Sequence, residues 1–163
     1  MKRITGLIIS IIFLTFINAC AEYKPLYTTN FQFKIADYSI QKNKKLGRQI
    51  YSKLYNLSKS NEDNAEIQNI TVLIDLAKDK SPTSKDSKGK ILEYRITLNS
   101  NIIIKDYFSG DEILNQYFSY SSSYKVQDQY SETIKLENQS IINLIDKTFQ
   151  NLLIKMSENI LVK

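Results

Sequence analysis

The sequence lacks histidine altogether and contains one cysteine and four glycines in 163 residues. Histidine is the side chain most used in general acid–base catalysis and in metal binding, so this chain lacks the commonest residue for either kind of site. The single cysteine cannot form a disulfide within the chain, and the few glycines form no phosphate-cradling loop. Asp and Glu pairs remain, but none stands in a recognisable catalytic setting. We therefore expect no catalytic residue, no metal and no dissociable cofactor, and hence a protein that is not an enzyme.

Residues 1–19 have the layout of a bacterial signal peptide. Two basic residues near the start precede an unbroken apolar run from Leu7 to Ile17, which is shorter than the about 20 residues that span a bilayer. A small residue then stands directly before Cys20 and an aliphatic one stands three positions before it. This is the pattern of a lipobox, in which the cysteine is acylated and the chain is cut in front of it. We predict that Cys20 carries lipid; an ordinary secretory signal with an incidental cysteine, or an uncleaved N-terminal anchor, are the alternatives.

Removal of the signal peptide changes the size and charge of the chain only slightly. Cleavage before Cys20 would leave 163 − 19 = 144 residues, with 22 − 2 = 20 basic residues against 17 acidic ones. The resulting net charge of about +3 is too small for the footprint of a nucleic-acid-binding protein. A chain of this length suits one domain with a single core. We predict that residues 20–28, which contain Pro25, form a lipidated tether and that residues 29–163 form the domain.

The spacing of apolar residues changes along the chain and predicts its secondary structure. Alternation with a period of two predicts strands over residues 30–37, 67–78, 91–108 and 112–126. Spacings of three and four predict helices over residues 44–59 and about 130–160, the second with Asp128 as its N-cap. The predicted architecture is an α+β two-layer sandwich, in which two helices cover one face of a four-stranded mixed sheet in the order strand, helix, three strands, helix. The first two strands are expected to be parallel because a helix joins them, and the other sheet face is expected to stay open.

Each predicted helix has one apolar stripe that should pack on the sheet. In the first helix the stripe consists of Leu46, Ile50, Leu54 and Leu57. In the second helix it consists of Ile134, Ile141, Ile142, Ile145, Phe149, Leu152, Leu153, Met156 and Ile160. We expect Leu54, Ile145, Phe149 and Leu152 to be buried against the sheet.

Two stretches have compositions that suit a surface rather than a core. Residues 78–90 hold Pro82, Gly89 and five lysines, which predicts an exposed loop or hairpin tip. This segment is either a mobile, solvated connection or an electrostatic contact for a polyanion. The strand over residues 112–126 combines tyrosines with four serines. Such a surface adapts well to polar partners, because tyrosine is rigid and amphipathic and serine offers hydrogen bonds.

The sequence that follows Cys20 reads Ala-Glu-Tyr-Lys-Pro-Leu-Tyr, so an aromatic residue closely precedes Pro25-Leu26-Tyr27. The first predicted helix contains the pair Arg48-Gln49, and a Tyr-rich strand and a long closing helix complete the chain. In these features the chain resembles the LPS-assembly lipoprotein LptE family, especially its alphaproteobacterial branch, over nearly its whole mature length. Two positions depart from the family pattern, since Ala21 stands where glycine is usual and one extra residue precedes the proline.

The resemblance implies an outer-membrane lipoprotein on the periplasmic face that plugs the barrel protein LptD and assists assembly of lipopolysaccharide into the outer leaflet. Its implied partners are an LptD-like barrel, lipopolysaccharide and the membrane that holds the lipid anchor, with no nucleic acid. The candidate contacts to the phosphates of lipopolysaccharide are Lys80, Lys85, Lys88, Lys90 and Arg95. The candidate contacts to the polar lumen of the barrel are Tyr117, Ser119, Ser121 and Ser123. A structural envelope lipoprotein that binds peptidoglycan or another envelope protein is the alternative function.

Overall fold

A computed structural model describes residues 33–59 and 67–160 of the chain. Its elements follow in the order β1 (Phe33–Lys42), α2 (Lys44–Lys59), β2 (Gln68–Lys85), β3 (Ile91–Asp106), β4 (Glu112–Lys125) and α3 (Tyr130–Ile160). The predicted α+β class and the predicted order of elements are confirmed. The predicted signal peptide, Cys20 and the tether lie outside the described residues and stay predictions.

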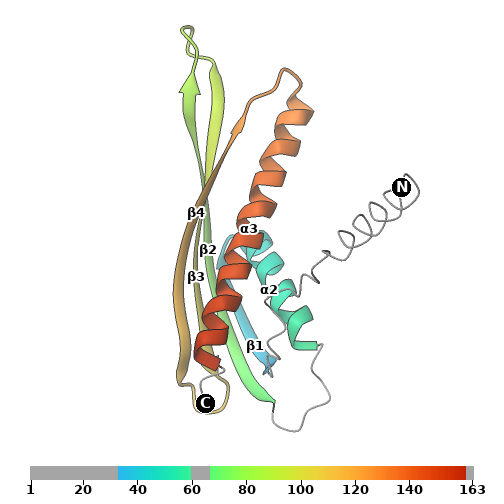
Figure 1. Cartoon of the computed structure of the whole chain (residues 1–163), viewed down its shortest axis with the longest axis vertical. Helices are drawn as coiled ribbons and strands as arrows, with labels where there is room; N and C mark the ends of the chain where they lie inside the picture. Colours follow the sequence, from blue (N-terminus) through green and yellow to red (C-terminus); the bar gives the residue numbers. More distant parts are fainter. Residues whose placement is uncertain (1–32, 60–66, 161–163) are drawn as a thin grey trace, which may run out of the picture.

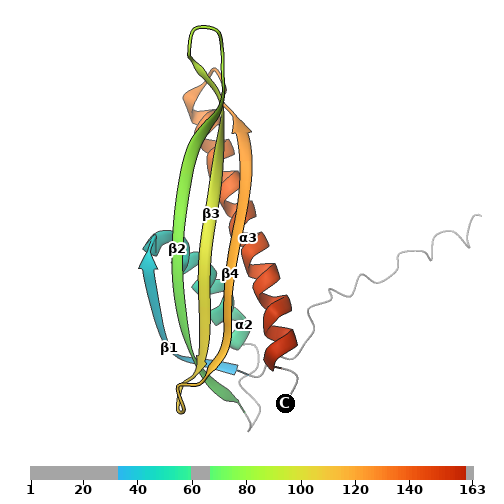
Figure 2. The ribbon, with the colours of Figure 1, turned by 90° about the vertical axis from the view of Figure 1, so that its left-hand side faces the viewer.

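The four strands form one sheet in the order β1-β2-β3-β4, and both described helices lie on the same face of it (Figures 1 and 2). β1 and β2 are parallel, as expected for strands joined through a helix, while the β2–β3 and β3–β4 pairs are antiparallel. The β2–β3 hairpin projects past the helices at one end of the molecule (Figure 2). The opposite face of the sheet, which we call the open face, is covered by neither α2 nor α3.

The core lies between the two helices and every second residue of the strands. Leu54 and Leu152 are 0% exposed and Ile145 is 1% exposed, which confirms their predicted burial, whereas Phe149 is only partly buried. Gly47 stands where α2 packs closely on β1, and a side chain at this position would collide with Ile40. The glycine that weakens the helix locally therefore permits close packing of α2 on the sheet.

The first strand is longer than its alternation predicts. β1 continues to Lys42 instead of residue 37, and the predicted residues 30–32 lie outside the described part of the chain. A bulge between Ile35 and Asp37 shifts the alternation, while the pairing with β2 continues on both sides of it. The alternation of side chains is therefore interrupted at the bulge, although the backbone pairing with β2 continues past it.

The second strand also extends beyond its prediction, because β2 runs to Lys85 instead of residue 78. Most of the predicted loop is thus strand, and only residues 86–90 form the hairpin tip. The backbone of this part pairs with β3, while most of its side chains remain exposed. Pro82 has no N–H to donate, but it is compatible with this part of β2 because β1 ends opposite Leu76 and β2 is an edge strand from there on.

The inward stripe of α3 contains hydroxyl residues that a search for apolar side chains misses. Thr133, Ser140 and Thr148 are at most 7% exposed. Ile142 is 46% exposed, so its predicted burial was wrong. The buried hydroxyl of Thr148 donates to the carbonyl of Leu144 at 2.9 Å, which satisfies it within the helix. The helix is therefore rotated slightly from the stripe that the apolar residues predict.

The start of α3 also differs from its prediction. The helix begins at Tyr130, so Gln129 rather than Asp128 takes the N-cap position. The N–H of Gln127 donates to Thr133 Oγ1 at 2.8 Å, so the incoming chain is tied to the first turn by a residue inside the helix. Thr133 thus helps to fix the start of the helix, a role that the sequence predicts for Asp128.

Candidate functional site

The four residues predicted to contact a partner, Tyr117, Ser119, Ser121 and Ser123, lie together on the open face. They alternate along β4 and are all exposed. The residues between them, such as Phe118 at 7% exposure, point toward the helices. Since side chains alternate between the two faces of a strand, β4 presents its hydroxyls on one side and contributes to the core on the other.

A hydrogen-bond network extends this surface across three strands. Tyr117 Oη and Ser119 Oγ both donate to Asn99 Oδ1, at 3.1 Å and 2.7 Å. Asn99 Nδ2 in turn donates to Asp79 Oδ2 at 3.3 Å. Asn99 and Asp79 are not among the contact residues predicted from the sequence. The alternation of side chains along β3 puts Asn99 on this face, and the register with β2 and β4 brings it close to its partners.

The open face also has a small apolar area beside its polar network. Leu73 of β2 and Ile103 of β3 are directly opposite each other, and both are partly exposed. They line a shallow hollow of about 180 Å³ together with Ser39, Gln41, Asp75 and Asn101. The face is therefore a polar surface that carries the charged side chains of Asp75, Asp79 and Arg95 beside one apolar area.

The lysines predicted to bind phosphates are divided among different places. Lys85, Lys88 and Lys90 are exposed around the tip of the β2–β3 hairpin. Within residues 33–59 and 67–160, none of these three forms an ion pair. Arg95 lies apart from them on the open face, opposite Ser123. The hairpin tip thus concentrates three free positive charges, and Arg95 extends the charge toward the β4 hydroxyls.

The hairpin tip is an ordered turn. Asp86 Oδ1 accepts hydrogen bonds from the N–H groups of Lys88 and Lys90, both at 2.9 Å. Gly89 has a φ of 82°, a left-handed conformation that glycine adopts without strain. The backbone of the turn therefore has a defined hydrogen-bonded conformation, and its lysine side chains are exposed.

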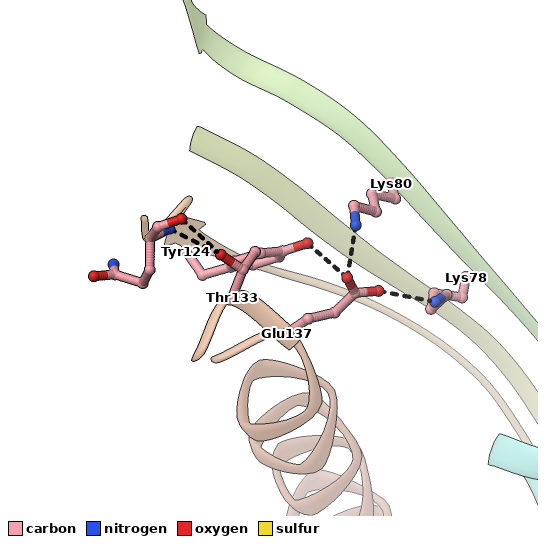
Figure 3. Close-up of polar contacts among 6 residues, drawn as sticks. Lys78, Lys80, Tyr124, Thr133 and Glu137 are labelled. Carbon is pink, nitrogen blue, oxygen red and sulfur yellow. Dashed lines mark hydrogen bonds and ion pairs between the residues drawn. The ribbon is translucent and has the colours of Figure 1, made fainter. Parts of the chain in front are cut away.

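Lys80 lies on the opposite, helix-covered side and forms a charged cluster with α3 (Figure 3). Its Nζ is 2.6 Å from Glu137 Oε2, and Lys78 Nζ is 3.5 Å from Glu137 Oε1. Tyr124 Oη donates to Glu137 Oε2 at 2.8 Å. The side chain of Glu137 is only 13% exposed, so these contacts compensate its charge where water reaches it poorly.

The hydrogen bonds and ion pairs of this cluster shift the pKa values of Glu137 and Lys80. Burial would raise the pKa of Glu137, but hydrogen bonds from Lys80 and Tyr124 outweigh it and lower that pKa below its ordinary value. Burial would likewise lower the pKa of Lys80, yet its hydrogen bonds to Glu137 and Tyr124 raise it. Lys80 Nζ also lies 4.3 Å from the centre of the Tyr94 ring, a cation–π contact. Lys80 is therefore paired with groups of the protein itself, unlike the three lysines of the tip.

A hollow of about 430 Å³ lies between the start of α3 and the β2–β3 hairpin. Lys80 and Lys90 both line it, together with the apolar or aromatic side chains of Ile91, Tyr94, Val126, Tyr130 and Ile134. Among the described residues, no group of acidic, cysteine or histidine side chains could hold a metal ion. The described helices also include none long and apolar enough to cross a membrane.

Comparison with known proteins is informative only at the level of the fold. No family model and no curated protein sequence matches the chain. The crystal structure of a minor lipoprotein from Acinetobacter baumannii is similar with a TM-score of 0.55 and 17% identity, covering 78% of this chain and 92% of that one. The solution structure of lipoprotein B from Nitrosomonas europaea is similar with a TM-score of 0.55 and 14% identity, covering 76% and 83%. The chain therefore has the fold of these two proteins.

Proposed function

We propose that the protein is an outer-membrane lipoprotein that plugs the lumen of an LptD-like barrel and assists assembly of lipopolysaccharide into the outer leaflet. The observation that carries this proposal is the open face, with its exposed Tyr117 and its row of serines on a sheet whose other face is closed by helices. A barrel lumen is polar, and the hydroxyl and amide side chains of this face can exchange hydrogen bonds with it.

The direction of the long axis supports the same function. Residues 1–32, with Cys20, precede β1, and β1 starts at the end of the molecule opposite the β2–β3 hairpin tip (Figure 2). β3 has 16 residues, which corresponds to a length of about 50 Å at about 3.4 Å per residue. A bilayer with its headgroups is about 40–45 Å thick. A domain anchored at one end and upright in a barrel would bring Lys85, Lys88 and Lys90 near the phosphates of the outer leaflet.

The lipid anchor is the second part of the proposal. The two similar solved structures are described as lipoproteins, and Cys20 stands in a lipobox pattern in this chain. We expect mass spectrometry to find residue 20 at the mature N-terminus with the added mass of acyl chains, since stable attachment requires two or more. Cys20→Ala should leave the precursor uncleaved and reduce its retention in the outer membrane. A mature N-terminus elsewhere with a free thiol would contradict the anchor.

The function is tested by what the acylated protein holds in the envelope. A tagged protein, purified from detergent-solubilised outer membrane, should retain a large β-barrel in stoichiometric amount and should bind purified lipopolysaccharide. If it instead sediments with purified peptidoglycan and retains no barrel, the structural envelope lipoprotein is the correct function.

A further inference from the structure

The turn between β3 and β4 exposes the two aromatic side chains of Tyr107 and Phe108. Phe108 is 79% exposed, more than any other large hydrophobic side chain among the described residues, and Tyr107 is 50% exposed. Their rings meet edge to face with centroids 5.3 Å apart. A single exposed hydrophobic side chain is common, but two adjacent aromatic side chains on one turn form an exposed apolar patch, which is a feature of contact sites.

The exposure of this pair is built into the fold. Asp106 Oδ1 accepts hydrogen bonds from the N–H groups of Phe108 and Ser109, at 2.9 Å and 3.0 Å. Gly110, with a φ of 76°, closes the turn by donating to the carbonyl of Asp106 at 3.0 Å. The N–H of Tyr107 donates to the carbonyl of Asn69 and ties the turn to the start of β2. The aromatic pair is therefore held outward by an ordered frame.

The turn lies at the end of the molecule where the N-terminal segment joins the domain. β1 and β2 both start at this end, and the β3–β4 turn lies beside them (Figures 1 and 2). Phe33, the first residue of β1, is 33 − 20 = 13 positions after Cys20. Thirteen residues span at most about 45 Å, so an acylated Cys20, or an apolar run from Leu7 to Ile17 that stays as an anchor, would keep this end of the domain within reach of the membrane.

The charges around the turn select the kind of membrane surface. Asp106, Asp111 and Glu112 surround the aromatic pair, with Lys105 as the nearby basic residue. This excess of negative charge opposes an anionic lipid surface but not a zwitterionic one. Aromatic side chains favour the headgroup region of a bilayer, where the ring is dehydrated while polar groups stay wet.

We propose that the Tyr107–Phe108 turn is a second membrane contact, which docks on zwitterionic phospholipid beside the N-terminal anchor and inserts Phe108 among the headgroups. The inference rests on the membrane attachment of the proposed function, but it does not depend on a barrel or on lipopolysaccharide. Together, the anchor and the turn would hold the long axis of the domain upright on the membrane.

The experiment uses the absence of tryptophan from the chain, because one introduced indole then reports alone. Phe108→Trp places the probe in the turn, and Tyr130→Trp is a matched control, since Tyr130 is 78% exposed and lies at the other end of the long axis. Both full-length mature proteins, acylated, are reconstituted on vesicles of phosphatidylethanolamine and phosphatidylcholine with brominated acyl chains. Emission is excited where tyrosine does not absorb, and attachment is verified by flotation.

We expect the Phe108→Trp emission to shift to shorter wavelength and to be quenched by the brominated lipid, while the Tyr130→Trp emission stays unchanged. Replacing part of the lipid with phosphatidylglycerol should reduce the quenching at low salt. If the protein floats but the indole at residue 108 is not quenched, the turn proposal is wrong and the anchor stands. Equal quenching of both probes means that the domain lies flat, which also overturns the proposal. Failure to float removes the anchor, and the turn proposal with it.

Discussion

Glu137 offers a sharp test of how the helix layer is held on the sheet. Its carboxylate accepts a hydrogen bond from Tyr124 and forms ion pairs with Lys80 and Lys78. Glu137→Gln keeps the shape of the side chain but removes its charge, so two ammonium groups lose their counter-ion. Removing one partner of a fully buried pair costs about 3–5 kcal/mol. The lysine side chains are 34% and 28% exposed and can partly rehydrate, so we expect a loss of about 1.5–3 kcal/mol.

The assay is urea denaturation of the mature protein, with Glu158→Gln as the matched control. Glu158 is on the same helix and pairs with Lys155 at 2.8 Å, but its side chain is 52% exposed. Exposed pairs of this kind contribute about 0–0.5 kcal/mol, so the control should unfold almost like the natural protein. Equal losses for the two variants, or a loss below about 0.5 kcal/mol for Glu137→Gln, would refute the structural role of the cluster.

The contribution of the cluster should also depend on pH with a definite sign. The folded state lowers the pKa of Glu137 below its reference value of 4.5, so its contribution is present above that pH and is lost as the pH falls through the folded pKa. The folded state raises the pKa of Lys80 above its reference value of 10.5, so that contribution is present below this pH and is lost as the pH rises further. The stability difference between the natural protein and Glu137→Gln should therefore be largest between these values and should shrink below pH 4.5. A difference that is constant from pH 3 to pH 8 would contradict a charge-based role.

Three further predictions concern the core and the two surfaces. Leu152→Ala should cost about 2–5 kcal/mol in the same denaturation assay, because Leu152 is 0% exposed and a cavity would remain. Ser121→Asp should leave stability unchanged yet weaken barrel capture at least about tenfold, because it places an unpaired carboxylate in the interface. The control Ser131→Asp, at an exposed position of α3, should capture the barrel normally. Lys85→Glu combined with Lys88→Glu should reduce binding of purified lipopolysaccharide, most clearly at low salt, and should leave barrel capture intact.

The local parts of the fold are readable from the sequence because they depend on periodicity. The helix predicted over residues 44–59 has the bounds of α2, and the alternation in β4 places its exposed hydroxyls on one face. Parallel pairing of the first two strands follows from the helix between them. The two periodicities are specified by neighbours within a few positions along the chain, and the parallel pairing by the helix that connects the two strands.

The parts that could not be predicted depend on contacts between distant residues. Lys80 and Glu137 are 57 positions apart and meet only because α3 packs across the sheet. The one signal in the sequence was the position of Glu137 on the predicted apolar stripe, three residues after Ile134 and four before Ile141, where an acidic residue needs a partner. The strand around Pro82 could not be seen either, because its side chains are exposed and only the backbone ladder to β3 holds it.

Buried residues on the other side of β4 determine which of its side chains lie on the open face. Ser121, Ser122 and Ser123 are identical neighbours, so they cannot by themselves decide which of them faces the helices. A shift of one residue would exchange the two faces of β4 and bring Ser122 to the open side. Phe118 and Tyr124 prevent this shift, because both are buried beneath α3 and the register between them is continuous. The surface proposed to meet the barrel is therefore set by the core behind it, and damage to that core should disturb barrel capture even where no contact residue is changed.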